Sequence, residues 1–193
     1  LYNTLDSIVW MAEDGDNQKV VEMTSDLSDF FRTVLSGGSD FIPIEEEKRH
    51  IESYLKIQKF RYKDQFEYEF QVDESCLGYY CNKITLQPII ENAIYHGLKY
   101  KESKGLLQVK GFMKDGNAVL QVIDNGVGMD EETLSHIYDK HKVNYHSNGV
   151  GVYNVQKRLK LYYGENYGIT YESEKGVGTT ATITIPGIQE ESI

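Results

Sequence analysis

The segment Pro88–Gly97 carries a carboxylate, an amide and an imidazole at helical spacing. At roughly 100° per residue, Glu91, Asn92 and His96 fall on one side of a helix whose opposite side is apolar. The oxygen of an Asn amide is a hard neutral ligand, suited to a partly hydrated Mg²⁺ that bridges phosphates. The stripe can therefore hold a metal–phosphate group, although taken alone it fits a solvated helix face better.

A second motif runs from Val122 to Met129 and contains Asp124-Asn125-Gly126-Val127-Gly128. Asp124 ends an apolar strand, and an ionised Asp only accepts hydrogen bonds, so it suits the exocyclic amine of adenine. Gly126 and Gly128 permit positive φ and a close approach of a ligand to the backbone. The competing interpretation is a plain turn, since Asp-Asn-Gly favours turns. The motif is neither a Rossmann fingerprint nor a Walker loop, because no Gly-Lys-Ser/Thr follows.

Two further glycine-containing segments follow the second motif. Asn148-Gly149-Val150-Gly151-Val152 opens a helix, where free N–H groups and the positive end of the dipole attract an anion. Lys140, His141, Lys142 and His146 lie just upstream and could close over phosphates, although a surface loop is the preferred explanation for each of them. Gly176-Val177-Gly178-Thr179 precedes a strand, and Thr179 either donates to a phosphate or simply favours that strand.

The elements that would position these motifs follow from the hydrophobic periodicity. We predict strands at 66–72, 106–113, 118–124, 169–173 and 179–186, and helices at 1–12, 20–34, 43–62, 86–100 and 150–163. Residues 125–148 read as loop-rich. Adjacent strand pairs mixed with helices predict an α+β fold, a two-layer α/β sandwich preceded by a helical segment. We place the boundary between 1–63 and 64–193.

The composition limits the classes of partner and of site that the chain can have. The net charge of −10 argues against a nucleic-acid partner, since an acidic surface repels a phosphate backbone. Any nucleotide site must therefore be neutralised locally. Cys76 and Cys81 have no further ligands at zinc spacing and are expected to be reduced and packed as small apolar groups. No apolar run is long enough for a membrane span. His50, among charged neighbours, is expected on a solvated helix face.

Together, the order and spacing of the four motifs resemble the Bergerat ATP-binding fold shared by histidine kinases, gyrase B, Hsp90 and MutL. This resemblance covers residues 66–186. The segment Leu1-Tyr2-Asn3-Thr4-Leu5 resembles the end of the phosphoacceptor motif His-Phe-Leu-Tyr-Asn-Thr-Leu of the LytS/YesM-type histidine kinases. Residues 54–62 resemble the Tyr-Leu-x-Ile-Gln-x-x-Arg-Tyr segment of the same family.

The resemblance implies the catalytic part of a two-component sensor histidine kinase that uses ATP and Mg²⁺. By this resemblance Glu91 is the catalytic acid/base, Asn92 holds Mg²⁺ and Asp124 binds adenine. The implied nucleotide-binding set is Asn92, Tyr95, His96, Asp124, Gly126, Gly128, Met129, Gly149, Val150, Gly151, Val152 and Thr179. No clear Phe-rich box lies between Met129 and Gly149, so a short lid is expected.

Further expectations concern the partners. The resemblance implies a homodimer formed through the helical segment, relay to the receiver domain of a response regulator, a cytoplasmic location, and membrane attachment only through upstream parts. The acceptor His would lie two residues before Leu1. The chain itself is therefore expected to bind Mg·ATP without phosphorylating itself at the usual place.

Two other functions remain open at this point. In a Bergerat-fold ATPase, such as a gyrase or MutL domain, Glu91 would activate water; the Leu-Tyr-Asn-Thr-Leu segment argues against this. A non-catalytic, nucleotide-binding dimer scaffold is the second alternative. The presence of Glu91, Asn92 and Asp124 together argues against it.

Overall fold

The computed structural model describes residues 2–35, 40–62, 65–138 and 149–190. The helices are α1 (Tyr2–Glu13), α2 (Asn17–Leu35), α3 (Ile44–Arg61), α4 (Glu74–Leu77), α5 (Gln87–Asn92), α6 (Glu131–Ser135) and α7 (Gly149–Tyr163). A π-helical turn, η1 (Ala93–Gly97), and a 3₁₀ turn, η2 (Leu98–Tyr100), continue α5. The strands are β1 (Phe41–Pro43), β2 (Phe66–Val72), β3 (Tyr80–Asn82), β4 (Gly105–Lys114), β5 (Asn117–Asp124), β6 (Gly168–Glu174) and β7 (Gly178–Pro186).

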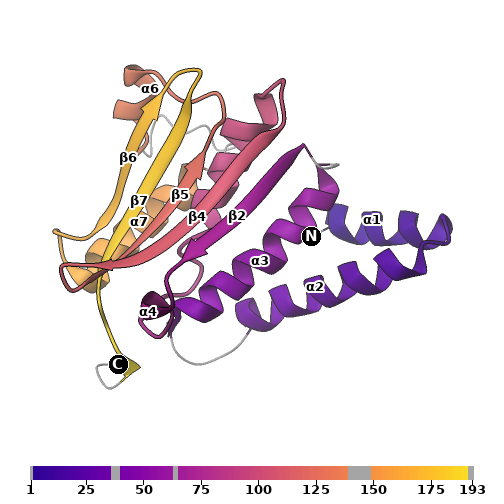
Figure 1. Ribbon diagram of the computed structural model, residues 1–193, viewed down its shortest axis with the longest axis horizontal. Coiled ribbons are helices and arrows are strands. Elements are labelled where there is room, and N and C mark those ends of the chain that lie inside the picture. The colour runs from indigo at the N-terminus through magenta and orange to yellow at the C-terminus, as the bar shows by residue number, and fades with distance from the viewer. Residues whose placement is uncertain (1, 36–39, 63–64, 139–148, 191–193) are drawn as a thin grey trace.

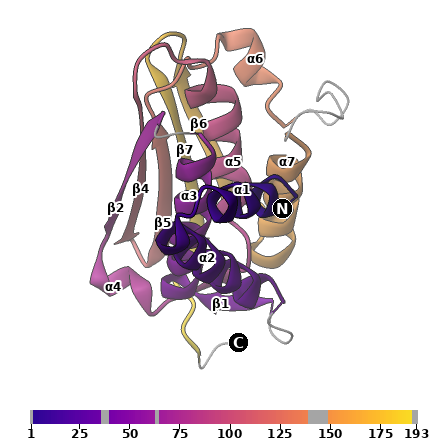
Figure 2. The ribbon, with the colours of Figure 1, turned by 90° about the vertical axis from the view of Figure 1, so that its right-hand side faces the viewer.

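The five-stranded sheet has the order β2-β4-β5-β7-β6 (Figure 1). Strands β2 and β4 pair in parallel, and the other neighbours are antiparallel. Viewed from the side, α5 and α7 cover one face of this sheet (Figure 2). Residues 107, 109 and 111 of β4 alternate with less buried neighbours, as expected for a sheet with one covered face. The predicted two-layer α+β fold and its helical N-terminal segment are confirmed.

Helix α3 lies between the α1–α2 hairpin and the sheet (Figure 1). On one side Ile51 and Leu55, each 0% exposed, belong to the same hydrophobic core as the strands. On another side Ile57 packs with Met11 and Met23 in a second cluster beneath α1 and α2. The helix is therefore shared: its packing joins the helical segment to the sheet.

The five predicted strands are present with ends within one residue of the prediction, but the predicted helix 86–100 is not regular. It widens into the π turn at Ala93–Gly97 and tightens into the 3₁₀ turn. The backbone oxygen of Gly97 accepts a hydrogen bond from Val127 N at 3.2 Å, so the turn brings the end of this helix against the segment after β5. A π turn inside a helix is often found at a functional site.

The prediction that His50 lies on a solvated face is wrong, because its side chain is only 1% exposed. The neighbouring Glu47 is also fully buried. Helix α2 covers α3 on one side and the segment before α5 covers it on another, so these polar side chains face protein instead of water. Cys76 and Cys81 are free and buried, as predicted. Within the described ranges no helix combines the length and apolarity needed to cross a membrane.

Candidate functional site

A pocket lies between α5 with its π turn and the ends of β5 and β7. Its lining consists of Ile89, Asn92, Ala93, His96, Gly97, Val122, Asp124, Gly128, Met129, Tyr171, Thr179 and Ala181. Six of the residues singled out from the sequence are thus brought to one place: Asn92, His96, Asp124, Gly128, Met129 and Thr179. They come from three motifs that are far apart in the chain, and the fold brings them together in one pocket.

Asp124 ends β5 and is 6% exposed. Its Oδ1 accepts a hydrogen bond from the backbone N–H of Gly126 at 2.8 Å. Burial raises the pKa of this carboxyl group to about 6, against the opposing effects of hydrogen bonds from the Gly126 and Thr179 backbones and of the Lys101 charge. A carboxylate that is this desolvated and lines a pocket is a strong acceptor for a ligand N–H group.

The glycines of the Asp124 motif allow segments of backbone to pack closely. A Cβ on Gly126 would lie 2.4 Å from the carbonyl carbon of Gly97, and one on Gly97 would lie 2.7 Å from Asp124 Oδ1. Gly128 has φ +61°, and a Cβ there would lie 2.0 Å from Glu174 O. Because these glycines have no Cβ, the π turn, the end of β5 and the β6–β7 hairpin can pack closely against one another. Gly126 itself does not line the pocket.

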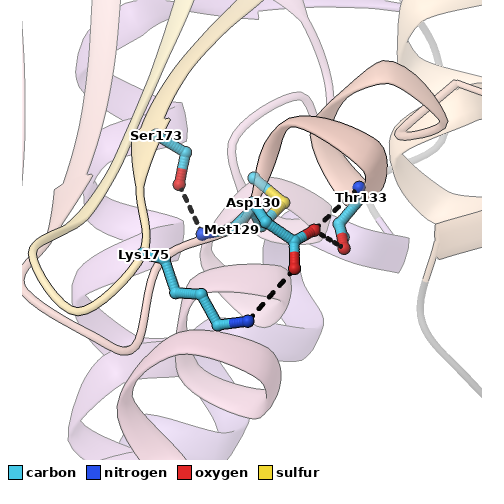
Figure 3. A network of polar contacts seen from close by, with 5 residues as sticks. All are labelled: Met129, Asp130, Thr133, Ser173 and Lys175. Carbon is cyan, nitrogen blue, oxygen red and sulfur yellow. Dashed lines mark hydrogen bonds and ion pairs between the residues drawn. The ribbon is translucent and has the colours of Figure 1, made fainter.

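The segment after β5 is fastened to the β6–β7 hairpin by a polar network that sequence reasoning missed (Figure 3). Met129 N donates to Ser173 Oγ at 2.8 Å, and Lys175 Nζ lies 3.1 Å from Asp130 Oδ2. Asp130 also caps α6, accepting from Thr133 N at 3.0 Å. The Thr133 hydroxyl, its N–H and Lys175 lower the pKa of Asp130 to about 2. The N-cap pattern Asp-x-x-Thr was the available signal for this anchor.

The α5 side of the pocket presents Asn92, whose amide has no hydrogen-bond partner among the described residues. Glu91 precedes it, and its Oε1 accepts from Gln87 Nε2 at 2.8 Å. His96 also lines the pocket; partial desolvation of its imidazole, followed by the Lys99 charge, lowers its pKa. Tyr95 points elsewhere, since its hydroxyl accepts from Arg61 Nη1 at 3.1 Å and it is not in the lining.

The third motif opens α7 at Gly149, as predicted, but Gly151 and Val152, the motif residues whose side-chain positions the structure describes, do not line the pocket. A Cβ on Gly151 would lie 3.0 Å from Pro88 Cβ, so Gly151 packs against the start of α5. Val152 is 1% exposed and belongs to the core. The side chain of Val150 and the basic residues Lys140, His141, Lys142 and His146 lie outside the described residues.

Tyr171 of β6 is a pocket residue that the sequence analysis did not identify. Its ring packs edge-on against Tyr138, with ring centroids 6.0 Å apart. Its hydroxyl is buried and has no hydrogen-bond partner in the described part of the chain. The period-two alternation of β6 placed Tyr171 on the same face as Ile169, which was the only signal for it.

Of the described residues, no group of three or more His, Cys, Asp and Glu side chains could hold a metal ion. A Mg²⁺ ion commonly needs only one or two protein oxygens, with water and phosphate completing its coordination. The Asn92 amide in the pocket fits this chemistry.

The structure is a two-layer α/β domain with an Asp, an Asn amide and close-packed glycines around one pocket. The family model described as histidine kinase-, DNA gyrase B- and HSP90-like ATPase matches residues 81–189. The chain therefore belongs to this family. A second model, described as histidine kinase, matches residues 1–66.

Similarity to individual known proteins makes the family assignment more specific. The sensor histidine kinase YesM of Bacillus subtilis (strain 168) is 31% identical over 96% of this chain and 31% of its own length. The sensor protein LytS of Oceanobacillus iheyensis is 34% identical over 78% of this chain and 26% of its own. The chain thus spans between about a quarter and a third of the length of these curated relatives. The resemblance to LytS/YesM-type sensor histidine kinases is confirmed.

Among solved structures, the catalytic domain of histidine kinase ThkA superimposes with a TM-score of 0.60. The identity is 16%, and the match covers 78% of this chain and 99% of that domain. At this identity the likeness concerns the fold alone.

Proposed function

We propose that this chain binds Mg·ATP in the pocket and transfers the γ-phosphate to a histidine, for relay to the receiver domain of a response regulator. The observation that carries the proposal is the placement of the buried Asp124 carboxylate and the Asn92 amide in the lining of one pocket, with Glu91 next to Asn92 in the chain. The protein would act as a homodimer on the cytoplasmic side of a membrane. Residues 1–63 would form the helical dimerisation segment and 64–193 the ATP-binding domain.

In this proposal, Asp124 accepts a hydrogen bond from the exocyclic amine of adenine. Gly128, Met129 and Thr179 surround the base, and Asn92 holds Mg²⁺ through its amide oxygen. When bound, Mg²⁺ supplies neutralisation of the triphosphate charge, which an acidic protein needs. The start of α7, with Gly149, Val150, Gly151 and Val152, offers backbone N–H groups to the phosphates. His96 also belongs to the proposed set. Gly126 would contribute by packing against Gly97, and Tyr95, whose hydroxyl accepts from Arg61 outside the pocket, is not assigned a contact with the nucleotide.

Glu91 is the proposed catalytic residue. As general base it takes the proton from the attacking imidazole while the phosphoryl group transfers. The nitrogen–phosphorus bond forms as the bond between the γ-phosphorus and the bridging oxygen breaks, and ADP leaves with the electron pair. Phosphoryl transfer depends chiefly on positioning and charge neutralisation, which suits a site with few reactive side chains.

Asp124→Asn tests the adenine contact. The change replaces an acceptor by an amide that can present N–H to the adenine amine. A hydrogen bond to a charged group contributes about 1.5–3 kcal/mol, so we expect the Kd for Mg·ATP, measured by calorimetry, to rise about tenfold to a hundredfold.

Asp115→Asn is the matched control, because Asp115 lies in the β4–β5 turn away from the pocket. Its affinity for Mg·ATP should equal that of the unaltered chain. An unchanged affinity in Asp124→Asn would remove Asp124 from the site. No binding by the unaltered chain would contradict the proposed function itself.

The pKa of Asp124 also predicts a pH dependence of binding. Because this pKa is raised to about 6 in the free protein, the carboxyl group becomes protonated as the pH falls below that value. A ligand amine favours the ionised form, so the affinity for Mg·ATP should be greatest above pH 6. Below it, affinity should fall by up to about tenfold per pH unit.

ATP also gains a proton in this range, so the comparison is with Asp124→Asn, which shares that effect. Calorimetric titrations between pH 5 and 8 should show a steeper loss of affinity in the unaltered chain than in the variant. Parallel curves would mean that Asp124 does not titrate at the nucleotide.

A further inference from the structure

A hydrogen-bond network connects α3 to the proposed catalytic carboxylate. His50 Nε2 lies 2.8 Å from Gln87 Oε1, and Gln87 Nε2 lies 2.8 Å from Glu91 Oε1. The residues come from two helices, with His50 on α3 and the other two at the start and end of α5. We call these three residues the His50–Gln87–Glu91 network.

The chemistry of the three side chains fixes the direction of both hydrogen bonds. An ionised carboxylate only accepts, so the amide nitrogen of Gln87 must face Glu91. The amide oxygen of Gln87 then faces His50 and can only accept, so the hydrogen must sit on His50 Nε2. The network therefore has one orientation, and each side chain determines that of the next.

His50 is held in place by its surroundings. Its ring is 1% exposed and stacks on Phe30 of α2, with ring centroids 4.8 Å apart and an interplanar angle of 21°. Its Nδ1 is buried and has no hydrogen-bond partner among the described residues. Among the described residues, the Gln87 amide is thus the hydrogen-bond partner of this imidazole. Because the ring is buried, losing that hydrogen bond would be costly.

The turn before α5 is also tied to α3. Glu47 accepts three backbone hydrogen bonds, from Ile84 N at 3.0 Å, Thr85 N at 2.7 Å and Leu86 N at 2.8 Å. Ile84 has φ 55°, a conformation that β-branched residues avoid. Arg158 of α7 donates to Ile84 O at 3.0 Å. The start of α5 therefore cannot shift relative to α3 without breaking these contacts.

We propose that Gln87 and His50 are positioning residues for phosphoryl transfer: together they hold the carboxylate of Glu91 in its working orientation. Gln87 engages Oε1, which directs the remaining oxygen of Glu91 to the incoming imidazole. Helix α3 thereby determines the orientation of the general base. Phe30 of α2 stacks on the His50 ring and helps to hold it in place. This inference rests on the proposed function of Glu91.

The test uses this chain with a helical extension that ends in His-Phe directly before Leu1, which completes the phosphoacceptor motif; we call it the acceptor-extended chain. Gln87→Met keeps the length of the side chain and removes both hydrogen bonds. A misplaced catalytic group can cost about a hundredfold. We therefore expect the rate of acid-labile phosphoprotein formation at saturating ATP to fall about tenfold to a hundredfold, with the Kd for Mg·ATP unchanged within about twofold.

Substitutions at His50 separate positioning from folding. His50→Gln retains an N–H donor at a similar reach, whereas His50→Leu fills the space without a donor. The rate should be low in His50→Leu and substantially recovered in His50→Gln. In the unaltered chain, two-bond ¹H–¹⁵N spectra should show His50 protonated at Nε2, and the Nδ1-protonated tautomer would overturn the proposal.

Gln108→Met is the matched control. Gln108 donates to Glu69 Oε2 at 3.0 Å on the exposed sheet, so this change removes an amide–carboxylate pair far from α5. Its rate should equal that of the unaltered chain. Equal rates in Gln87→Met and the unaltered chain overturn the inference while leaving the proposed function intact. Absence of Mg·ATP binding or of phosphoprotein in the unaltered acceptor-extended chain contradicts the proposed function instead.

Discussion

Glu47→Ala is expected to lower the free energy of unfolding by about 3–5 kcal/mol, because a buried donor left unpaired costs about 1–3 kcal/mol. The Glu47 carboxylate is 0% exposed and accepts from three successive backbone N–H groups of residues 84–86. Alanine leaves all three without an acceptor and opens a cavity beside them. Chemical denaturation followed by circular dichroism measures the loss.

Glu45→Ala is the control for this experiment, since Glu45 occupies the same first turn of α3 but is exposed. Only a favourable interaction with the helix dipole is lost there, about 0.3–1 kcal/mol. Glu47→Gln keeps one acceptor oxygen and should fall between the two. Equal stabilities of the Glu47→Ala and Glu45→Ala variants would show that the turn before α5 does not depend on the Glu47 carboxylate.

Glu91→Gln should reduce phosphoprotein formation in the acceptor-extended chain by about a hundredfold to a thousandfold, within the range that general acid–base catalysis contributes. The amide cannot take a proton from the attacking imidazole. It retains the size of the glutamate, so the Kd for Mg·ATP should stay within about twofold of the unaltered value. Labelled ATP followed by acid and base stability of the product measures the rate and the bond type.

Glu102→Gln supplies the comparison, because Glu102 is an exposed carboxylate in the loop before β4. It should transfer phosphate at the unaltered rate. A normal rate in Glu91→Gln would exclude Glu91 as the base. Release of inorganic phosphate from ATP without any phosphoprotein, abolished by Glu91→Gln, would favour the ATPase interpretation, in which Glu91 activates water.

The pocket was largely predictable because its residues are identified by local chemistry. Asp124 follows a strand and precedes glycines, and Asn92 lies on the polar side of an amphipathic segment. Hydrophobic alternation locates a strand end closely, so the prediction of β5 also located its last residue. What the sequence did not predict is why the glycines are needed: Gly126 and Gly128 accommodate neighbouring backbone in this structure.

The residues that were misjudged are those whose role is set by distant parts of the chain. His50 lies among charges, which is typical of a solvated helix face, and only tertiary packing brings Gln87 against it. Tyr171 was indistinguishable from any strand tyrosine. The irregular helix after Asn92 was missed because a single π turn leaves the apolar pattern of a 15-residue window nearly unchanged.

Because α3 packs against both the sheet and the α1–α2 hairpin, it limits where the chain can be shortened from its N-terminal side. An excised piece beginning after Arg61 would lack Ile51 and Leu55, exposing the apolar surface beneath them, and would also lack the acceptor for residues 84–86. A piece beginning at Phe41 retains α3 and the pairing of β1 with β3. The smallest unit that keeps the pocket on an intact core therefore starts at Phe41, about 25 residues before β2, inside the segment that the histidine kinase family model covers.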